Sequence, residues 1–193
     1  MAVKKKKTVD KFKKKKWFTL VAPKSFDKKP LGETPAEKSK ILIGRIVKKT
    51  VDELTGQRKQ RHITANFKVT EIRELNALTE IVGFEINNSY LRRMIRRRIS
   101  KIETVVTGTT KDGKTLRVKA VAVSARHIEK TKEKSIRKIM TDELLSEIAK
   151  KTLEQLLQEM IFGLTSIELM KKAKEVSMLK RLEITKARVM EGK

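Results

Sequence analysis

Residues 62–70 alternate strictly between polar and apolar side chains. Ile63, Ala65, Phe67 and Val69 fall on one face of an extended chain, because successive side chains of a β-strand point to opposite faces. A period of two is typical of a half-buried antiparallel strand. The pattern predicts a strand here, with these four residues in the core.

Two more strand-like segments flank this one. Residues 41–51 are rich in β-branched side chains, and residues 77–86 carry large apolar residues on one face. Three consecutive strands predict an antiparallel meander. Residues 24–39 hold two of the three prolines of the chain and are predicted to form a loop. The residues expected on the apolar face of the third strand are Leu78, Val82, Phe84 and Ile86.

Residues 104–123 form another alternating region, interrupted at Asp112 and Gly113. This dipeptide is favoured in a type I′ turn, in which both central residues have positive φ. The region therefore predicts a second β-hairpin, whose turn is flanked by cations that make it a candidate basic finger into RNA. These cations are Lys111, Lys114, Arg117 and Lys119.

Residues 89–103 combine six basic side chains with regularly spaced apolar ones. On a wheel of 100° per residue the apolar residues fall within a sector of about 140°, and Arg98 falls inside that sector. The pattern predicts a helix over 89–103 that is anchored by its apolar face. The arginines predicted on the opposite face are Arg92, Arg93, Arg96 and Arg97.

The sequence offers these arginines no local anion. Neither Asp nor Glu occurs between Glu85 and Glu103, although like charges spaced four residues apart repel each other on a helix. Phosphate oxygens would relieve the repulsion and match the planar guanidinium group. The pattern therefore favours binding of a nucleic acid over a solvated helix face.

The C-terminal part, residues 126–193, is predicted to form amphipathic helices. Thr141 is the predicted N-cap of a long helix over 142–162, and Gly163 is the predicted stop. Thr165 to Glu168 fits a capping box for a shorter helix that ends near Ser177, and residues 181–191 are predicted to form a final strand. A protein neighbour on the apolar stripe of the long helix, at Leu156 and Leu157, is a further hypothesis.

Charge is the extreme feature of the composition. The 193 residues include 48 Lys and Arg but 23 Asp and Glu, for a net charge of +25, which argues for a polyanionic partner. Together the patterns predict an α+β protein with an antiparallel, β-rich body. The predicted organisation is a disordered basic tail at 1–16, a body at 17–125 and a helical part at 126–193, with 17–193 as one domain.

Several other kinds of site are disfavoured. The chain has no cysteine, and no apolar run approaches the roughly 20 residues that span a bilayer. His62 and His127 are the only histidines and are expected on the surface or at an RNA edge. We therefore predict no catalytic residue, no metal site and no cofactor. Trp17 is expected in the core rather than stacked on a base.

RNA is favoured over a DNA regulatory site. The sequence shows no convincing helix-turn-helix, zinc-finger spacing, KH loop or RRM strand motif. Eight aromatic residues in all make base stacking a minor mode, so phosphate and shape contacts are expected. The residues predicted to bind RNA are Lys4, Lys5, Lys6, Lys7, Lys11, Lys13, Lys14, Lys15, Lys16, Arg92, Arg93, Arg96, Arg97, Lys111, Lys114, Arg117 and Lys119.

Four motifs carry a resemblance to a known family. They are "VDKFKKKKWFTLVAPKSF", the pair Gly44-Arg45, "TKDGKTLRVK" and "SIRKIM". With them the chain resembles the archaeal and eukaryotic small-subunit ribosomal protein family called S-three-A-e, or eukaryotic-type S-one. The resemblance runs in order over most of the chain. Residues 11–17 match the rRNA-directed N-terminal segment of the family, and residues 111–119 match its basic hairpin.

The resemblance implies a structural protein with no enzymatic activity and no required cofactor. Its members have a barrel-like β body with C-terminal helices, and they lie on the platform of the small subunit. There they are near the mRNA exit channel and the rRNA 3′ end, beside other ribosomal proteins. The last 31 residues match the family ending loosely, and the arginines at 92–98 are denser than the family pattern.

The sequence therefore predicts a structural constituent of the small ribosomal subunit, located in cytoplasmic ribosomes. Its expected partners are rRNA, neighbouring ribosomal proteins and mRNA near the exit channel, with no membrane involved. The alternative is a free RNA chaperone or a nucleoid-type protein that uses the same charges. A nuclease is a weaker rival, because the sequence lacks clusters of acidic residues or histidines.

Overall fold

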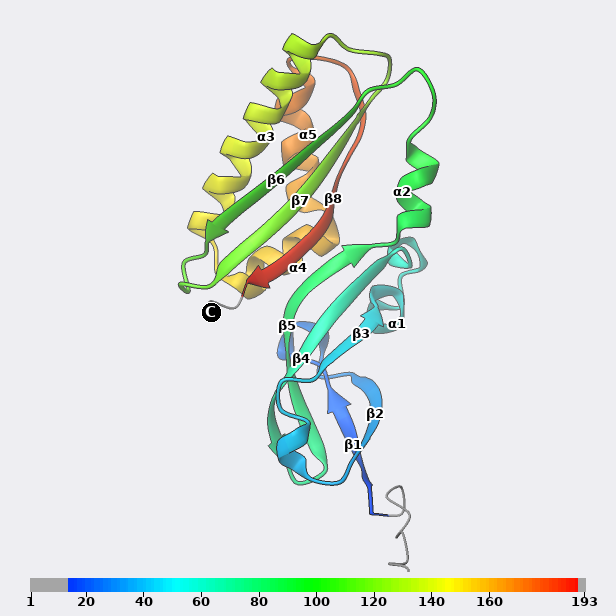
Figure 1. Ribbon diagram of the computed structural model, residues 1–193, viewed down its shortest axis with the longest axis vertical. Helices are drawn as coiled ribbons and strands as arrows, with labels where there is room; N and C mark the ends of the chain where they lie inside the picture. The colour runs from blue at the N-terminus through cyan, green and yellow to red at the C-terminus, as the bar shows by residue number, and fades with distance from the viewer. Residues whose placement is uncertain (1–13, 191–193) are drawn as a thin grey trace, which may run out of the picture. The chain divides into compact units, whose positions relative to one another are not determined.

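The computed structural model describes residues 14–190 and combines β-strands with helices (Figure 1). The lysines from Lys4 to Lys13 that are predicted to bind RNA, and most of the predicted basic tail, lie outside these residues. The strands are β1 (Lys16–Val21), β2 (Pro30–Ala36), β3 (Ile46–Thr50), β4 (Ile63–Arg73), β5 (Asn76–Ile86), β6 (Lys101–Thr109), β7 (Thr115–Ser124) and β8 (Leu179–Met190). The α-helices are α1 (Val51–Thr55), α2 (Asn88–Met94), α3 (Lys130–Lys150), α4 (Leu153–Phe162) and α5 (Leu164–Lys174).

The described chain divides into two compact units. The first holds residues 14–46 and 68–80, and the second holds residues 47–67 and 81–190. The border predicted at residue 125 lies inside the second unit. Strands β4 and β5 each supply residues to both units.

In the first unit β1 pairs with β2 antiparallel and with β5 parallel. The loop predicted over 24–39 is wrong in part, because β2 occupies its second half. Two prolines are tolerated in β2 because it ends the strand order as an edge strand, whose outer N–H groups need no partner. Phe18 and Leu20 of β1 and Leu31 of β2 are buried in this unit.

The predicted meander is confirmed, since β3 pairs with β4 and β4 with β5. All four apolar residues predicted to face inward on β4 are buried. The strand predicted from residue 41 begins only at Ile46. In β5 the predicted face is wrong for Leu78 and Val82, which are half-buried, while Phe84 and Ile86 are buried.

Strands β5, β8, β7 and β6 are adjacent in this order in the second unit. Helices α3, α4 and α5 cover one face of β6, β7 and β8 (Figure 1). Gly83 allows β5 to approach β8, since a Cβ at this position would lie 2.2 Å from the backbone oxygen of Ala187. The α+β class is confirmed. The resemblance implied a barrel-like body, and in the described residues the eight-stranded sheet is not closed.

Helix α3 begins at Lys130, twelve residues before the start predicted at residue 142. Thr141 is not an N-cap: it lies inside α3, where its hydroxyl donates to the Arg137 carbonyl at 2.8 Å. The helix is anchored by one fully buried residue every four positions, beginning with Ile136, and the polar first turns concealed this row in the sequence. The row consists of Ile136, Met140, Leu144 and Ile148.

The long predicted helix is divided at residues 151 and 152. The Lys151 carbonyl accepts a hydrogen bond from the Lys111 N–H at 3.2 Å, and the Asp112 carboxylate accepts one from the Leu153 N–H at 2.8 Å. The β6–β7 turn therefore satisfies the backbone groups that the interruption exposes. This tertiary contact has no local sequence signal.

The last elements follow the predictions more closely. Gly163 ends α4 with φ +82, as expected of a C-terminal stop. Helix α5 and strand β8 are both present, but Thr165 is buried inside α5 and makes no capping bond. None of the helices in residues 14–190 has the length and apolarity that crossing a membrane requires.

Candidate nucleic-acid interface

The arginine-rich segment, residues 92–98, begins on α2 and continues into the loop before β6. The side chains of its five arginines are exposed, whereas Leu91, Met94 and Ile95 are half-buried. Within residues 14–190, none of the five guanidinium groups has an ion pair or hydrogen bond. The segment thus keeps the predicted separation of a charged and an apolar side.

The helix predicted over 89–103 is wrong in its length, because α2 ends at Met94 and Arg96 and Arg97 lie in the loop. Lys101 to Glu103 instead form the first rungs of the β6–β7 ladder, with Lys101 opposite Val123. Extending the helix would also place like charges four residues apart. Strand pairing and charge repulsion therefore both favour the shorter helix.

Arg98 was missed as a candidate because the wheel put it in the apolar sector. It has φ +64, which is left-handed backbone, and its side chain is exposed. Non-glycine residues adopt this conformation at a cost of about 1–2 kcal/mol. No local pattern in the sequence signals such a position.

Helix α2 is held in place by its cap and by one aromatic residue. The Asn87 side chain accepts a hydrogen bond from the Ser89 N–H at 3.0 Å. Tyr90 stacks on His62 with 3.9 Å between ring centroids, and Arg181 lies 5.6 Å from the centre of the Tyr90 ring. These contacts fix the base of the arginine-rich segment without using any of its own cations.

The same contacts shift the pKa values of the anchoring groups. Burial lowers the pKa of His62, and the nearby Arg181 adds to this effect. Burial also raises the pKa values of Tyr90 and Glu183, which share a hydrogen bond. His62 is therefore a neutral stacking partner at neutral pH rather than an additional cation.

The predicted hairpin is confirmed, with β6 and β7 paired over nine rungs. The type I′ turn is wrong: Gly113 has φ +73, but Asp112 is not among the residues with positive φ. The Thr110 N–H donates to the Lys114 carbonyl at 3.0 Å, and the Gly113 N–H donates to the Thr110 carbonyl at 2.9 Å. This is a turn closed by one left-handed glycine.

The cations of the hairpin divide into two groups. Lys111, Lys114 and Arg117 are exposed near the turn. Lys119 is half-buried further along β7 and makes an ion pair with Glu103 at 3.1 Å. Binding of a phosphate by Lys119 would therefore compete with a carboxylate that is already present.

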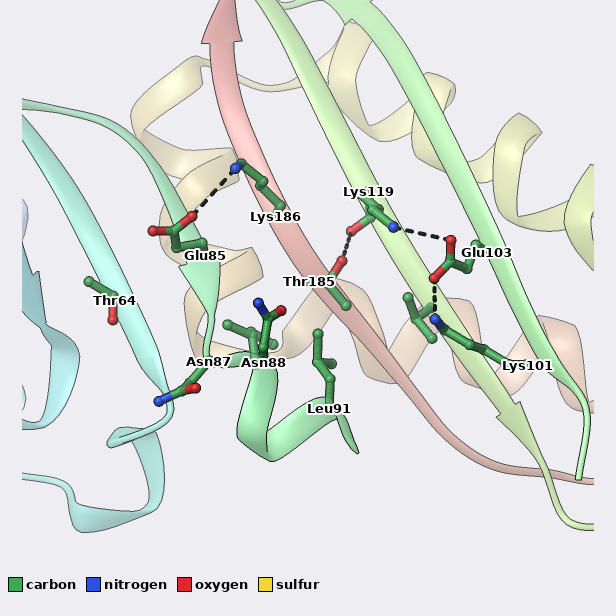
Figure 2. Close-up of a pocket in the computed structure, with 12 residues that line it drawn as sticks. Thr64, Glu85, Asn87, Asn88, Leu91, Lys101, Glu103, Lys119, Thr185 and Lys186 are labelled. Atoms are coloured by element: carbon green, nitrogen blue, oxygen red, sulfur yellow. Dashed lines mark hydrogen bonds and ion pairs between the residues drawn. The ribbon is translucent and has the colours of Figure 1, made fainter. Parts of the chain in front are cut away.

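Lys119 also lines a cleft of about 520 Å³ on the sheet face opposite the helices (Figure 2). Each of its two glutamates bridges two lysines. The pKa of Glu85 is lowered by its hydrogen bond to Lys48, at 2.7 Å, and by Lys186. The pKa of Glu103 is lowered by its hydrogen bonds to Lys101 and Lys119. The lysines of the cleft are thus paired with carboxylates, unlike the cations of the arginine-rich segment.

The profile of the Ribosomal S3Ae family matches residues 3–193. The chain belongs to this family. It is 34% identical to the small ribosomal subunit protein eS1 of Sulfurisphaera tokodaii, over 95% of each chain. It is 38% identical to the protein of the same name from Archaeoglobus fulgidus, over 94% of this chain and 87% of that protein. It is 32% identical to the protein of the same name from Staphylothermus marinus, over 94% of this chain and 85% of that protein.

The family match includes the parts that resembled the family least. The arginine-rich segment and the C-terminal elements α5 and β8 all lie within the matched residues. The Ribosomal S3Ae family is a family of ribosomal proteins. The resemblance read from the four motifs is thereby confirmed.

In the N-terminal family motif, the predicted position of Trp17 is wrong. Trp17, predicted to lie in the core, is 53% exposed, whereas its neighbour Phe18 is buried. Alternation along β1 explains this, because adjacent side chains face opposite sides. Lys14, Lys15 and Lys16 are also exposed, so Trp17 lies beside a run of cations.

Leu156 and Leu157 cannot contact a protein neighbour, since both side chains are fully buried in the core of the second unit. Substituting either by Asp would unfold this unit instead of testing an interface. The exposed apolar residues of the helices are Leu145, Phe162, Leu164 and Ile167.

Residues 14–190 contain no group of three or more acidic or histidine side chains that could hold a metal ion. The Nδ1 atom of His127 lies 3.3 Å from the Ser100 hydroxyl, and His62 stacks on Tyr90. Both histidines therefore have structural contacts in this part of the chain.

Proposed function

We propose that this protein is a structural constituent of the small ribosomal subunit and binds ribosomal RNA. One observation carries the proposal: five exposed arginines lie in seven residues, on an anchored element, with no anionic partner in the described chain. Guanidinium groups pair well with phosphate oxygens. Membership of a ribosomal protein family supports the same partner.

The proposed RNA surface has a main contact and secondary ones. Arg92, Arg93, Arg96 and Arg97 form the main contact. Lys111, Lys114 and Arg117 of the hairpin turn form the second, and Lys119 contributes only where its pair with Glu103 opens. The N-terminal lysines form the third, of which Lys14 to Lys16 are exposed in the structure.

Replacing Arg92, Arg93, Arg96 and Arg97 together by Gln tests the main contact. Each lost phosphate contact reduces the slope of log affinity against log salt concentration by about 0.7–0.9, so a decrease of about three is expected. The measurement is a titration of the purified chain with a small-subunit rRNA transcript at several salt concentrations. Arg-to-Lys replacements at the same positions are the control, because they keep the charge. An unchanged slope in the Gln variant would remove this segment from the interface.

A role for Trp17 in base stacking follows from its exposure beside Lys14 to Lys16. Stacking on an aromatic side chain contributes about 1–3 kcal/mol per base. Trp17 is the single tryptophan of the chain, so its fluorescence reports directly on this contact. Quenching by the rRNA transcript that is absent with a polyphosphate is expected, and equal spectra with both would refute stacking.

The proposed function puts the protein in cytoplasmic ribosomes, beside rRNA and neighbouring ribosomal proteins. The name borne by its relatives, small ribosomal subunit protein eS1, supports this assembly. A position on the platform, near the mRNA exit channel, is the finer part of the proposal. Crosslinking in isolated small subunits, followed by sequencing of the bound RNA, tests it, and crosslinks confined to rRNA far from the 3′ end would contradict it.

Sedimentation distinguishes this function from its rival. A structural constituent should co-migrate with small subunits through a sucrose gradient in high salt. A free RNA chaperone or a nucleoid-type protein would dissociate and remain near the top, because its binding depends on exchangeable phosphate contacts alone. The absence of the protein from washed subunits would therefore favour the rival.

A further inference from the structure

We infer that the first half of α3 continues the RNA-binding surface of the arginine-rich segment. The α3 basic face consists of Lys130, Lys134, Arg137 and Lys138. This inference rests on the proposed function and adds to it a second, separate element that binds phosphate groups of the same RNA.

The charges of the α3 basic face are unfavourable in the free protein. Lys130, Lys134 and Lys138 follow one another at intervals of four residues, so like charges are neighbours on the helix surface. Lys130 and Lys134 also lie in the first turns of the helix, where the backbone dipole favours anions. The sequence thus maintains an arrangement that only an external anion makes favourable.

Nearby acids do not neutralise these lysines. Glu133 and Asp142 lie within reach of a helical turn, yet none of the three lysines forms an ion pair within residues 14–190, and all three are exposed. Lys134, Arg137 and Lys138 line a depression of about 320 Å³ together with Thr141 and one acid, Asp142. The Arg137 Nε–H donates to the Glu103 carbonyl at 3.2 Å, which fixes that side chain against β6.

Two buried serines connect this face to the arginine-rich segment. The Ser100 N–H donates to the Ser124 hydroxyl at 2.8 Å, and the Ser124 N–H donates to the Ser100 carbonyl at 3.0 Å. The Ile128 N–H donates to the Ser100 hydroxyl at 3.1 Å. The start of β6 is therefore tied to the segment that leads into α3, at the same end of the sheet (Figure 1).

These bonds set an upper limit on the separation of the two groups of cations. Arg98 precedes Ser100 by two residues, and Lys130 follows Ile128 by two. Two residues span at most about 7 Å, so the backbone at Arg98 and that at Lys130 lie within about 20 Å. A nucleic-acid duplex carries roughly a dozen phosphate charges over this length. One RNA helix can contact both groups.

Sequence reasoning missed this face because the predicted helix began at Thr141. The signal was present in the repeat of basic residues every four positions, within the "SIRKIM" region and before it. It could be read as a helix face only once the buried row that starts at Ile136 had shown that the helix extends so far.

The test replaces Lys130, Lys134 and Lys138 by Gln in the full chain. The slope of log affinity for the small-subunit rRNA transcript against log salt concentration should fall by about two to three. The matched control replaces Lys150, Lys171 and Lys174 by Gln, which removes the same charge from other exposed lysines that form no ion pair within residues 14–190. Its slope should remain within about 0.5 of the unmodified protein.

Each outcome has one meaning. If the α3 variant keeps the original salt slope, or if the slope of the control variant falls equally, the inference is overturned. The proposed function is tested separately by the variant at Arg92, Arg93, Arg96 and Arg97. If the arginine variant also keeps its slope, the proposed function fails as well. Thermal melting verifies folding, and a Lys-to-Arg triple variant on α3, which retains the charge, should retain the slope.

Discussion

The two halves of α3 handle charge in opposite ways. The first half, residues 130–138, has five basic residues and one acid, and its lysines have no ion pair in the described chain. Beyond it, Glu143 pairs with Lys172 at 2.6 Å, and Lys151, which follows the helix, pairs with Glu147 and Glu159. Both halves bury the same row of apolar residues. Because both halves pack in the same way, we attribute the difference in ion pairing to the RNA that we expect to contact the first half.

The cleft on the sheet face opposite helices α3, α4 and α5 has paired charges, like the second half of α3. Its lysines are bridged by Glu85 and Glu103, which lowers the pKa values of both glutamates through hydrogen bonds. The charges of this cleft are thus paired within the folded chain. The five arginines of the arginine-rich segment and the three lysines of the α3 basic face have no ion pair within residues 14–190.

The largest expected effect comes from the packing that both halves share. Leu144→Ala removes a fully buried side chain, so the free energy of unfolding should fall by about 2–5 kcal/mol. Leu145→Ala, at a position 40% exposed, is the matched control and should change it by less than about 1 kcal/mol. Urea denaturation measures both. Equal losses would contradict the assignment of the core face, and a changed RNA salt slope in the folded variant would contradict the separation of packing from binding.

Arg98→Gly should affect stability and RNA binding in opposite directions. Glycine relieves the left-handed backbone at φ +64, so the free energy of unfolding should rise by up to about 1 kcal/mol. The loss of one phosphate contact should reduce the salt slope by about 0.7–0.9. Arg98→Gln is the control, since it removes the charge but keeps the strain. A glycine variant that binds RNA with the original slope would exclude Arg98 from the interface.

The smallest expected effect is the pH dependence of the stabilisation by the ion pairs of Lys151. Burial alone would lower the pKa of Lys151, but its hydrogen bonds to Glu147 and Glu159 raise the pKa to about 12. The folded state therefore holds this proton more tightly than the unfolded state, whose pKa is about 10.4. The resulting stabilisation, about 1 kcal/mol or less, is present below about pH 10.4 and is lost as the pH rises towards 12.

Alkaline unfolding of Lys151→Gln and Lys150→Gln separates this contribution from general titration. Lys150 has no ion pair in the described chain, so its variant should show the same loss of stability with pH as the unmodified protein. The Lys151 variant should show a smaller loss. Parallel curves for the two variants would mean that the ion pairs of Lys151 contribute nothing measurable.

The sequence by itself determined the elements whose pattern is local. The alternation in β4, the β6–β7 hairpin and the stop at Gly163 follow from side-chain periodicity and from backbone preferences of single residues, and all three are confirmed. The net charge and the run of arginines also indicated a polyanionic partner without any coordinates. The four motifs were sufficient for the family.

Tertiary structure decided the features that depend on distant residues. Pairing of β6 with β7 shortened the arginine-rich helix, and the docking of Asp112 on the Leu153 N–H divided the long C-terminal helix. The exposure of Trp17 depends on which face of β1 packs on the core, and that of Arg98 on a backbone angle that no periodicity encodes. The Ser100–Ser124 hydrogen bonds bring two basic segments together because they join residues 24 positions apart, and such a contact is fixed only when the sheet forms.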